Sequence, residues 1–250
     1  MARGTAGRDW QNDAGARLVA IIAVAVLGVV AVGTAALALG RDTGVDEGAT
    51  AAPVPTYGAG PTPTPTAATP SVVVIGDDFT SGTAQNTGPE WPALLGLDAD
   101  VTAQGVAESG YLVGGAGATF ADRAAALPAT TNVVVFLGGG DDPVAGLQAG
   151  VESAIAAART AAPESRIIVV GPPWTGSPDA VAASMIARRD AVAAAASAAG
   201  VVFVDPIADG WFADRDGLVG ADGIHPTDAG HARIAERLRP VLQEATAPAA

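Results

Sequence analysis

From Ser71 onward the sequence predicts a three-layer α/β domain built on one doubly wound sheet of five parallel strands. Short apolar segments alternate there with longer, alanine-rich segments of helical character. Val133–Leu137 and Ile167–Val170 are unbroken apolar runs, which are typical of parallel strands covered by helices on both faces. The alternation and the buried runs together favour a βαβα chain order.

The expected strands are Val72–Ile75, Val101–Gln104, Val133–Leu137, Ile167–Val170 and Val201–Val204. The expected helices lie near Pro89–Leu95, Phe120–Leu127, Pro143–Ala161, Pro178–Ala199 and Thr227–Glu244. Pro143, Pro178 and Pro226 stand where helices begin, a position that proline tolerates because the first amides of a helix have no internal acceptor. Thr227 or Asp228 is expected to cap the last helix.

Ligands of such sheets bind beyond the carboxyl ends of the strands. The loops expected at that edge are Gly76–Gly82, Gly105–Gly117, Gly138–Asp142, Gly171–Ser177 and Pro206–Pro226. Every candidate functional residue of the chain lies in one of them. The first loop reads GDDFTSG, which does not match the G-x-G-x-x-G pattern of a dinucleotide-binding turn.

The segment before this domain is predicted to attach it to a membrane. Residues 1–17 contain three arginines, and Leu18–Leu39 has no charge over 22 residues. As a helix this segment is about 33 Å long, enough to cross a bilayer. The arginines before it place the N-terminus in the cytoplasm and the domain of residues 71–250 outside, as a single-pass membrane protein. Cleavage after Ala36-Leu37-Ala38 is the alternative.

Residues 40–70 form a linker rich in proline and threonine, which favours an extended polyproline II conformation. The chain has no cysteine, which excludes disulfides, thiolate metal sites and cysteine catalysis. Its net charge is −13, and this acidity argues against nucleic acid as a partner.

Two motifs carry the functional signal. Gly76-Asp77-Asp78-Phe79-Thr80-Ser81-Gly82 follows the first strand, and Asp222-Gly-Ile-His225 precedes the last helix. This combination resembles the SGNH (GDSL) hydrolase family, in which the first block is G-D-S-x-x-x-G and the last is D-x-x-H. The last block matches fully, whereas Asp78 stands where the family has its nucleophilic serine.

Two further blocks extend the resemblance over roughly Val72–Leu242. The family's third block is G-x-N-D, with the asparagine donating to the oxyanion, and Gly138-Gly139-Gly140-Asp141 places Gly140 at that position. The second block supplies a glycine amide to the oxyanion, which is assigned to Gly110, with Glu108 as the alternative. The resemblance implies a flavodoxin-like three-layer fold, ester or acyl hydrolysis as the ancestral activity, and no cofactor.

The chemistry of a serine hydrolase needs a hydroxyl nucleophile, an imidazole base, a carboxylate that orients it, and oxyanion donors. Asp222 and His225 supply the base and its partner. Asp78 is a poor acyl acceptor, and a second carboxylate near His225 favours the charged imidazole, which is a poor base. Ser81 or Ser109 as a displaced nucleophile, and Asp78 itself as the nucleophile, remain alternatives.

A divalent cation is a further alternative, because carboxylates suit hard cations. Its ligands would be drawn from Asp77, Asp78, Asp141, Asp142 and His225. Trp174 and Trp211 are candidates for stacking on a sugar or acyl group. The sequence therefore predicts a domain that binds a carbohydrate, acyl or cell-envelope ligand without ordinary serine esterase activity. An active esterase of unusual mechanism is the competing hypothesis.

Overall fold

The structure, a computed structural model, describes residues 68–248 except residues 116 and 178. It contains one parallel sheet of five strands in the order β2-β1-β3-β4-β5. The strands are β1 (Ser71–Gly76), β2 (Asp100–Gly105), β3 (Val133–Leu137), β4 (Arg166–Val170) and β5 (Val202–Val204). The predicted five-stranded parallel α/β fold is thus confirmed.

The helices are α2 (Asp78–Ser81), the 3₁₀ helix η1 (Trp91–Leu94), α3 (Phe120–Ala124), α4 (Leu147–Ala161), α5 (Ala183–Ala199) and α6 (Asp228–Thr246). The helix expected from Pro143 begins only at Leu147, because Gly146 before it has a left-handed backbone, φ 85°. Thr227, rather than Asp228, caps α6: its hydroxyl accepts from the amide of Gly230 at 3.3 Å.

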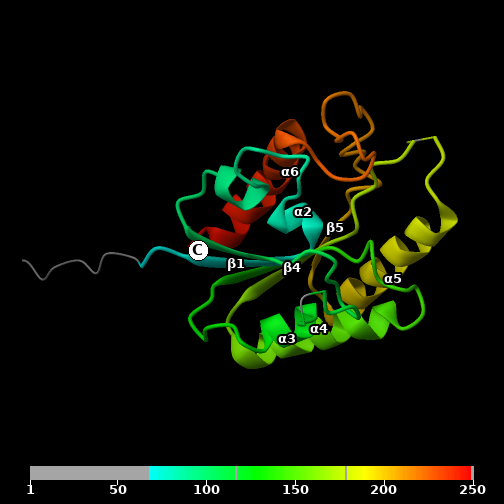
Figure 1. Ribbon diagram of the computed structural model, residues 1–250. Helices are drawn as coiled ribbons and strands as arrows, with labels where there is room; N and C mark the ends of the chain where they lie inside the picture. The colour runs from blue at the N-terminus through cyan, green and yellow to red at the C-terminus, as the bar shows by residue number, and fades with distance from the viewer. Residues whose placement is uncertain (1–67, 116, 178, 249–250) are drawn as a thin grey trace, which may run out of the picture. The chain divides into compact units, whose positions relative to one another are not determined.

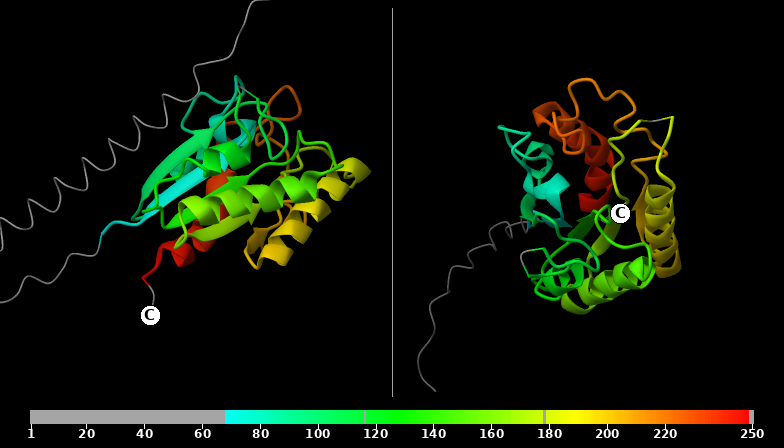
Figure 2. Two further views of the ribbon diagram at one scale, coloured as in Figure 1. Left: turned by 90° about the horizontal axis from the view of Figure 1, so that it is seen from below. Right: turned by 45° about the vertical axis from the view of Figure 1, so that its right-hand side comes forward.

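Helices cover both faces of the sheet because the chain winds away from β1 in both directions. Helices α3, α4 and α5 lie on one face, and α6 lies on the other with η1 and α2 (Figure 1). The further views show α4 and α5 side by side along the first face (Figure 2).

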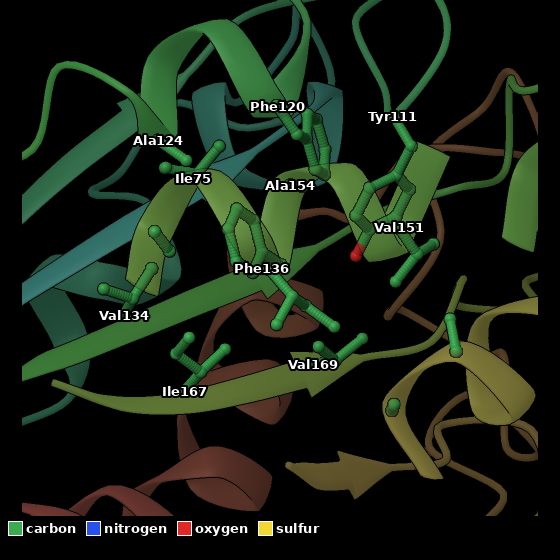
Figure 3. Close-up of a cluster of buried hydrophobic side chains, with 14 of the residues drawn as sticks. Ile75, Tyr111, Phe120, Ala124, Val134, Phe136, Val151, Ala154, Ile167 and Val169 are labelled. Carbon is green, nitrogen blue, oxygen red and sulfur yellow. The ribbon is translucent and has the colours of Figure 1, made fainter. Parts of the chain in front are cut away.

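Alternate residues of each central strand supply the two cores. Val134 and Phe136 of β3 face α3 and α4, where Phe136 stacks with Phe120 at a ring separation of 6.3 Å (Figure 3). Val133, Val135 and Leu137 face the layer that contains α6. All five residues of β3 are buried, which explains its unbroken apolar sequence.

The predicted span Leu18–Leu39 and most of the predicted linker lie outside the described residues. Among the helices that the structure does describe, none combines the length and apolar character needed to cross a membrane.

The chain enters the sheet at the amino end of β1, while α2 and the segment before α6 lie at the opposite, carboxyl end (Figure 1). That end is where the sequence predicts the site.

Candidate active site

A cleft of about 290 Å³ lies at the carboxyl end of the sheet. Its lining comes from the four loops that follow β1, β3, β4 and β5, and from α5. The lining residues are Asp77, Asp78, Phe79, Gly140, Asp141, Pro173, Trp174, Thr175, Gly176, Met185, Gly223, Ile224 and His225. The fold therefore brings Asp78, Gly140, Trp174 and His225 together, as the sequence predicts.

His225 and Asp222 form a hydrogen-bonded pair on one wall. The Nδ1 atom of His225 lies 2.7 Å from Oδ2 of Asp222. The other carboxylate oxygen of Asp222 accepts from the amides of Ile224 and His225, at 2.9 and 3.0 Å. The bond from the amide of Ile224, followed by the bonds from the side chain and the amide of His225, lowers the pKa of Asp222 to about 2. The pair has the contacts of a general base and its orienting carboxylate.

The opposite wall begins at the end of β1. Asp77 is 3% exposed and caps α2, where its Oδ1 accepts from the amide of Phe79 at 3.0 Å. Burial, and to a lesser extent the charges of Asp141 and Asp78, raises the pKa of Asp77 well above its usual value. Asp78, half-buried in the first turn of α2, accepts a hydrogen bond from the amide of Glu108 at 2.9 Å.

Glu108 has a positive φ of 56°, which is uncommon for a residue other than glycine. This backbone points its amide at Asp78. Gly110, the residue predicted to supply an oxyanion amide, is placed elsewhere. Its amide donates to the carbonyl of Val113 at 2.8 Å, and it does not line the cleft. The amide of Glu108, the alternative left open by the sequence, donates to Asp78 of the cleft, although Glu108 itself is not part of the lining.

Gly110 must lack a side chain because another residue approaches it closely. A Cβ at this position would lie 2.3 Å from Oδ2 of Asp142. Asp142 is fully buried, and its carboxylate accepts from the amides of Tyr111, Leu112 and Val113, at 2.9, 2.7 and 3.2 Å. Asp142 thus fixes the loop after β2 to the loop after β3.

Asp141 points the other way from its neighbour Asp142. It is exposed at the cleft, where partial desolvation and the charges of Asp78 and Asp142 raise its pKa, while His225 opposes that shift. Gly140 also lines the cleft, and a Cβ there would meet no atom closer than 4.0 Å. Both Gly140 and Asp141 thus border the cleft, and Asp141, considered from the sequence as a cation ligand, supplies the side chain there.

Neither alternative serine lines the cleft. The hydroxyl of Ser81 donates to the carbonyl of Gly82 at 3.3 Å. Ser109 is fully buried, donates to the carbonyl of Val106 at 2.6 Å, and accepts from Nη2 of Arg123 at 2.7 Å. These contacts give both serines structural roles.

The two tryptophans lie in different environments. Trp174 is half-buried and lines the cleft, with its indole N–H donating to the carbonyl of Ser177 at 2.9 Å. Trp211 is 1% exposed and belongs to the core beneath α6, so its ring is not available to a ligand in the cleft. The sequence could not distinguish them, because both occupy loops at the same edge of the sheet.

The divalent cation considered from the sequence has no ready set of ligands. Within residues 68–248, apart from residues 116 and 178, no group of three or more His, Asp or Glu side chains is arranged to hold a metal ion. Phe79, Met185 and Ile224, apolar residues that line the cleft, were not singled out by sequence reasoning. Phe79 lies 6.1 Å from the ring of His225.

The sequence matches the model of the GDSL-like Lipase/Acylhydrolase family over residues 74–233. It is 40% identical over 190 residues to a GDSL lipase of Mycobacterium tuberculosis, covering 68% of this chain and 80% of that protein.

Solved structures share the fold at lower identity. A lipase/acylhydrolase from Enterococcus faecalis has a TM-score of 0.52 and 18% identity, over 69% of this chain and 96% of that one. A carbohydrate esterase of family 2 from Corynascus thermopiles, with a carbohydrate-binding domain, has a TM-score of 0.54 and 20% identity, over 74% of this chain and 68% of that one.

Proposed function

Since this chain belongs to the GDSL-like lipase/acylhydrolase family, we propose that its cleft has been rebuilt to bind a ligand and has lost ordinary serine esterase activity. The observation that carries the proposal is the hydrogen bond from the amide of Glu108 to the carboxylate of Asp78. A carboxylate stands where the family resemblance expects a hydroxyl nucleophile, and it occupies an amide that an oxyanion would need.

Two chemical consequences follow from that contact. Attack by a carboxylate on an ester gives an anhydride, in place of the ester formed by a serine. The bound oxygen of Asp78 also competes with a substrate carbonyl for the donor that would stabilise developing negative charge. Removal of a nucleophile from a serine triad costs on the order of 10⁶ in turnover.

Asp141 supports the same proposal. The structure favours a second alignment of the third block, in which Gly139-Gly140-Asp141-Asp142 corresponds to G-x-N-D. Asp142 then takes the place of the aspartate, and Asp141 that of the asparagine. In this second alignment, the carboxylate of Asp141, an acceptor, replaces the amide donor of asparagine. In the first alignment, Gly140 takes that position and supplies no side-chain donor. Loss of one such donor costs about 10²–10³ in turnover.

The ligand class follows from the walls of the cleft. Phe79, Trp174, Met185 and Ile224 supply apolar surface, and the carboxylates beside them accept hydrogen bonds. This combination suits a carbohydrate, acyl or cell-envelope ligand that presents both an apolar face and polar donors.

Membrane attachment belongs to the same proposal and rests on the sequence alone. The uncharged segment Leu18–Leu39 and the arginines before it favour a single-pass anchor with the domain on the extracytoplasmic side.

A second candidate function is ester or acyl hydrolysis by an unusual mechanism. The 2.7 Å contact between His225 and Asp222 favours it, because a binding site has no need of an oriented imidazole. In this mechanism His225 would activate water or would serve Asp78 as the nucleophile.

Hydrolysis of p-nitrophenyl acetate by the purified full-length chain distinguishes the two functions. The proposal predicts a rate equal to that of the His225→Ala variant. Turnover by the wild-type chain that disappears in His225→Ala would establish the second function instead.

A further inference from the structure

The charge of the cleft is unusual for a site that would hold ester substrates. Asp77, Asp78 and Asp141 line it, and its lining includes no arginine; the chain has no lysine. The imidazole of His225, which lines the cleft, already has Asp222 as its hydrogen-bond partner. The nearby guanidinium of Arg188 donates to the carbonyl of Asp142 at 2.6 Å and is not part of the lining.

A polar side chain also borders the cleft beside these carboxylates. Thr175 is 6% exposed and borders the cleft. Its hydroxyl can accept as well as donate a hydrogen bond. Asp78, Asp141 and the Thr175 hydroxyl together supply acceptors for a donor-rich group.

The aromatic lining adds a second feature suited to a cation. Phe79 and Trp174 both line the cleft, and aromatic faces attract ammonium groups through their electron-rich surfaces. A neutral sugar would also stack on Trp174, but it would leave the excess of carboxylates without compensating charge. A carboxylate or phosphate ligand would add to that excess.

We infer that the cleft binds a ligand carrying a primary ammonium group, held by Asp78 and Asp141 beside the aromatic faces of Phe79 and Trp174. This inference rests on the proposed function, since a cleft that positioned ester carbonyls on the Glu108 amide would need Asp78 displaced. The ligand class includes sugars with a free amino group and other amines with an apolar face.

The electrostatics of the cleft favour such a ligand. Desolvation and the charges of Asp78 and Asp142 raise the pKa of Asp141 against the opposing effects of His225 and Arg188, so the carboxylates of Asp78 and Asp141 repel one another when ionised. A bound ammonium group relieves that repulsion, as a proton does, and binding is therefore strongest above the pKa of Asp141.

Three probes of nearly equal size and different charge test the inference: benzylammonium, benzyl alcohol and benzoate. Their binding to the purified full-length chain is measured by calorimetry and by the fluorescence of tryptophan, at about pH 7.5, where the amine is protonated and carboxylates are ionised. We expect benzylammonium to bind about tenfold more tightly than benzyl alcohol, and benzoate to bind most weakly.

Variants locate the charge that produces the difference. Asp141→Asn and Asp78→Asn keep the shape of the side chain and remove its charge, and each is expected to reduce benzylammonium affinity about threefold to tenfold. Asp98→Asn is the matched control, because Asp98 is exposed before the amino end of β2, at the opposite edge of the sheet. Its affinity for all three probes should equal that of the wild type.

Each outcome decides the inference. Equal affinity for the three probes, tighter binding of benzoate, absence of benzylammonium binding, or an equal loss in Asp98→Asn would overturn it. None of these results creates ester hydrolysis, so the proposed function would stand. Turnover of p-nitrophenyl acetate that depends on His225 would instead overturn the proposed function, whatever the probes show.

Discussion

The two walls of the cleft differ in how they relate to hydrolase chemistry. On one wall, Asp222 and His225 make the contacts that a general base and its orienting carboxylate require. On the other, Asp78 and Asp141 present carboxylates, and Asp78 occupies the amide of Glu108. One wall is suited to removing a proton, whereas the other has a carboxylate at position 78, and that carboxylate occupies the amide of Glu108.

A histidine with its orienting carboxylate does not by itself establish catalysis. An imidazole and its carboxylate accelerate acyl transfer only when a nucleophile and oxyanion donors act with them, because the members of a triad act as a unit. In the function proposed above, the carboxylates of the second wall determine which ligand the cleft accepts.

The largest expected effect comes from rebuilding the second wall. Replacing Asp78→Ser together with Asp141→Asn supplies a hydroxyl and an amide donor opposite the existing base. We expect the rate of p-nitrophenyl acetate hydrolysis to rise at least about 100-fold over that of the wild type. Adding His225→Ala to this variant should remove the gain.

The same experiment compares the two alignments of the third block. Asp78→Ser with Gly140→Asn tests the original one, and the open space at Gly140 admits the new side chain. A higher rate for the Gly140 variant would assign the donor position to Gly140. If both variants fold and neither hydrolyses the ester, the placement of the site would be wrong.

A smaller effect is expected on stability from Asp142→Ala. This change removes the acceptor of three backbone amides and leaves them without a partner beneath the second wall. We expect a loss on the order of 3 kcal/mol in the free energy of unfolding, measured by urea denaturation. A loss below about 1 kcal/mol would show that the loop after β2 is held by other contacts.

Substitutions in the first wall should reduce stability less, because the hydrogen bonds of that wall are local and partly exposed. Asp222→Ala removes the acceptor of the Ile224 and His225 amides, and a lowering of Tm by about 2–4 °C is expected at neutral pH. The depressed pKa of Asp222 means that its stabilisation is present above its unfolded value and is lost as the pH falls through about 2. The difference in Tm should therefore shrink in strong acid, and an undiminished difference would contradict the electrostatic account.

Asp77 beneath the second wall has the opposite dependence on pH. Its raised pKa means that the folded state favours the protonated carboxyl, so its stabilisation is complete below the unfolded pKa and is lost as the pH rises through the folded one. Asp77→Asn keeps an acceptor for the amide of Phe79 and cannot ionise. Thermal melts should show a small gain in Tm at neutral pH that disappears in acid, whereas a gain independent of pH would point to packing.

The first wall could be predicted from sequence because its geometry is local. Asp222 and His225 are three residues apart, and that spacing alone brings their side chains together. The strands could also be predicted, since the unbroken apolar run of β3 is a direct consequence of its burial on both faces.

The second wall is held by contacts between residues that lie about thirty positions apart in the sequence. Three consecutive glycines followed by two aspartates admit two alignments, and only the bonds from Asp142 to the loop after β2 distinguish them. The positive φ of Glu108 is equally hidden, because the sequence signal for that conformation is usually glycine.

Covalent labelling with a fluorophosphonate, followed by mass spectrometry, tests the central claim most directly. The wild-type chain should give no adduct on any serine, while Asp78→Ser with Asp141→Asn should be labelled at position 78. An adduct on a serine of the wild-type chain that disappears in His225→Ala would contradict the account, because the cleft would then contain a working nucleophile.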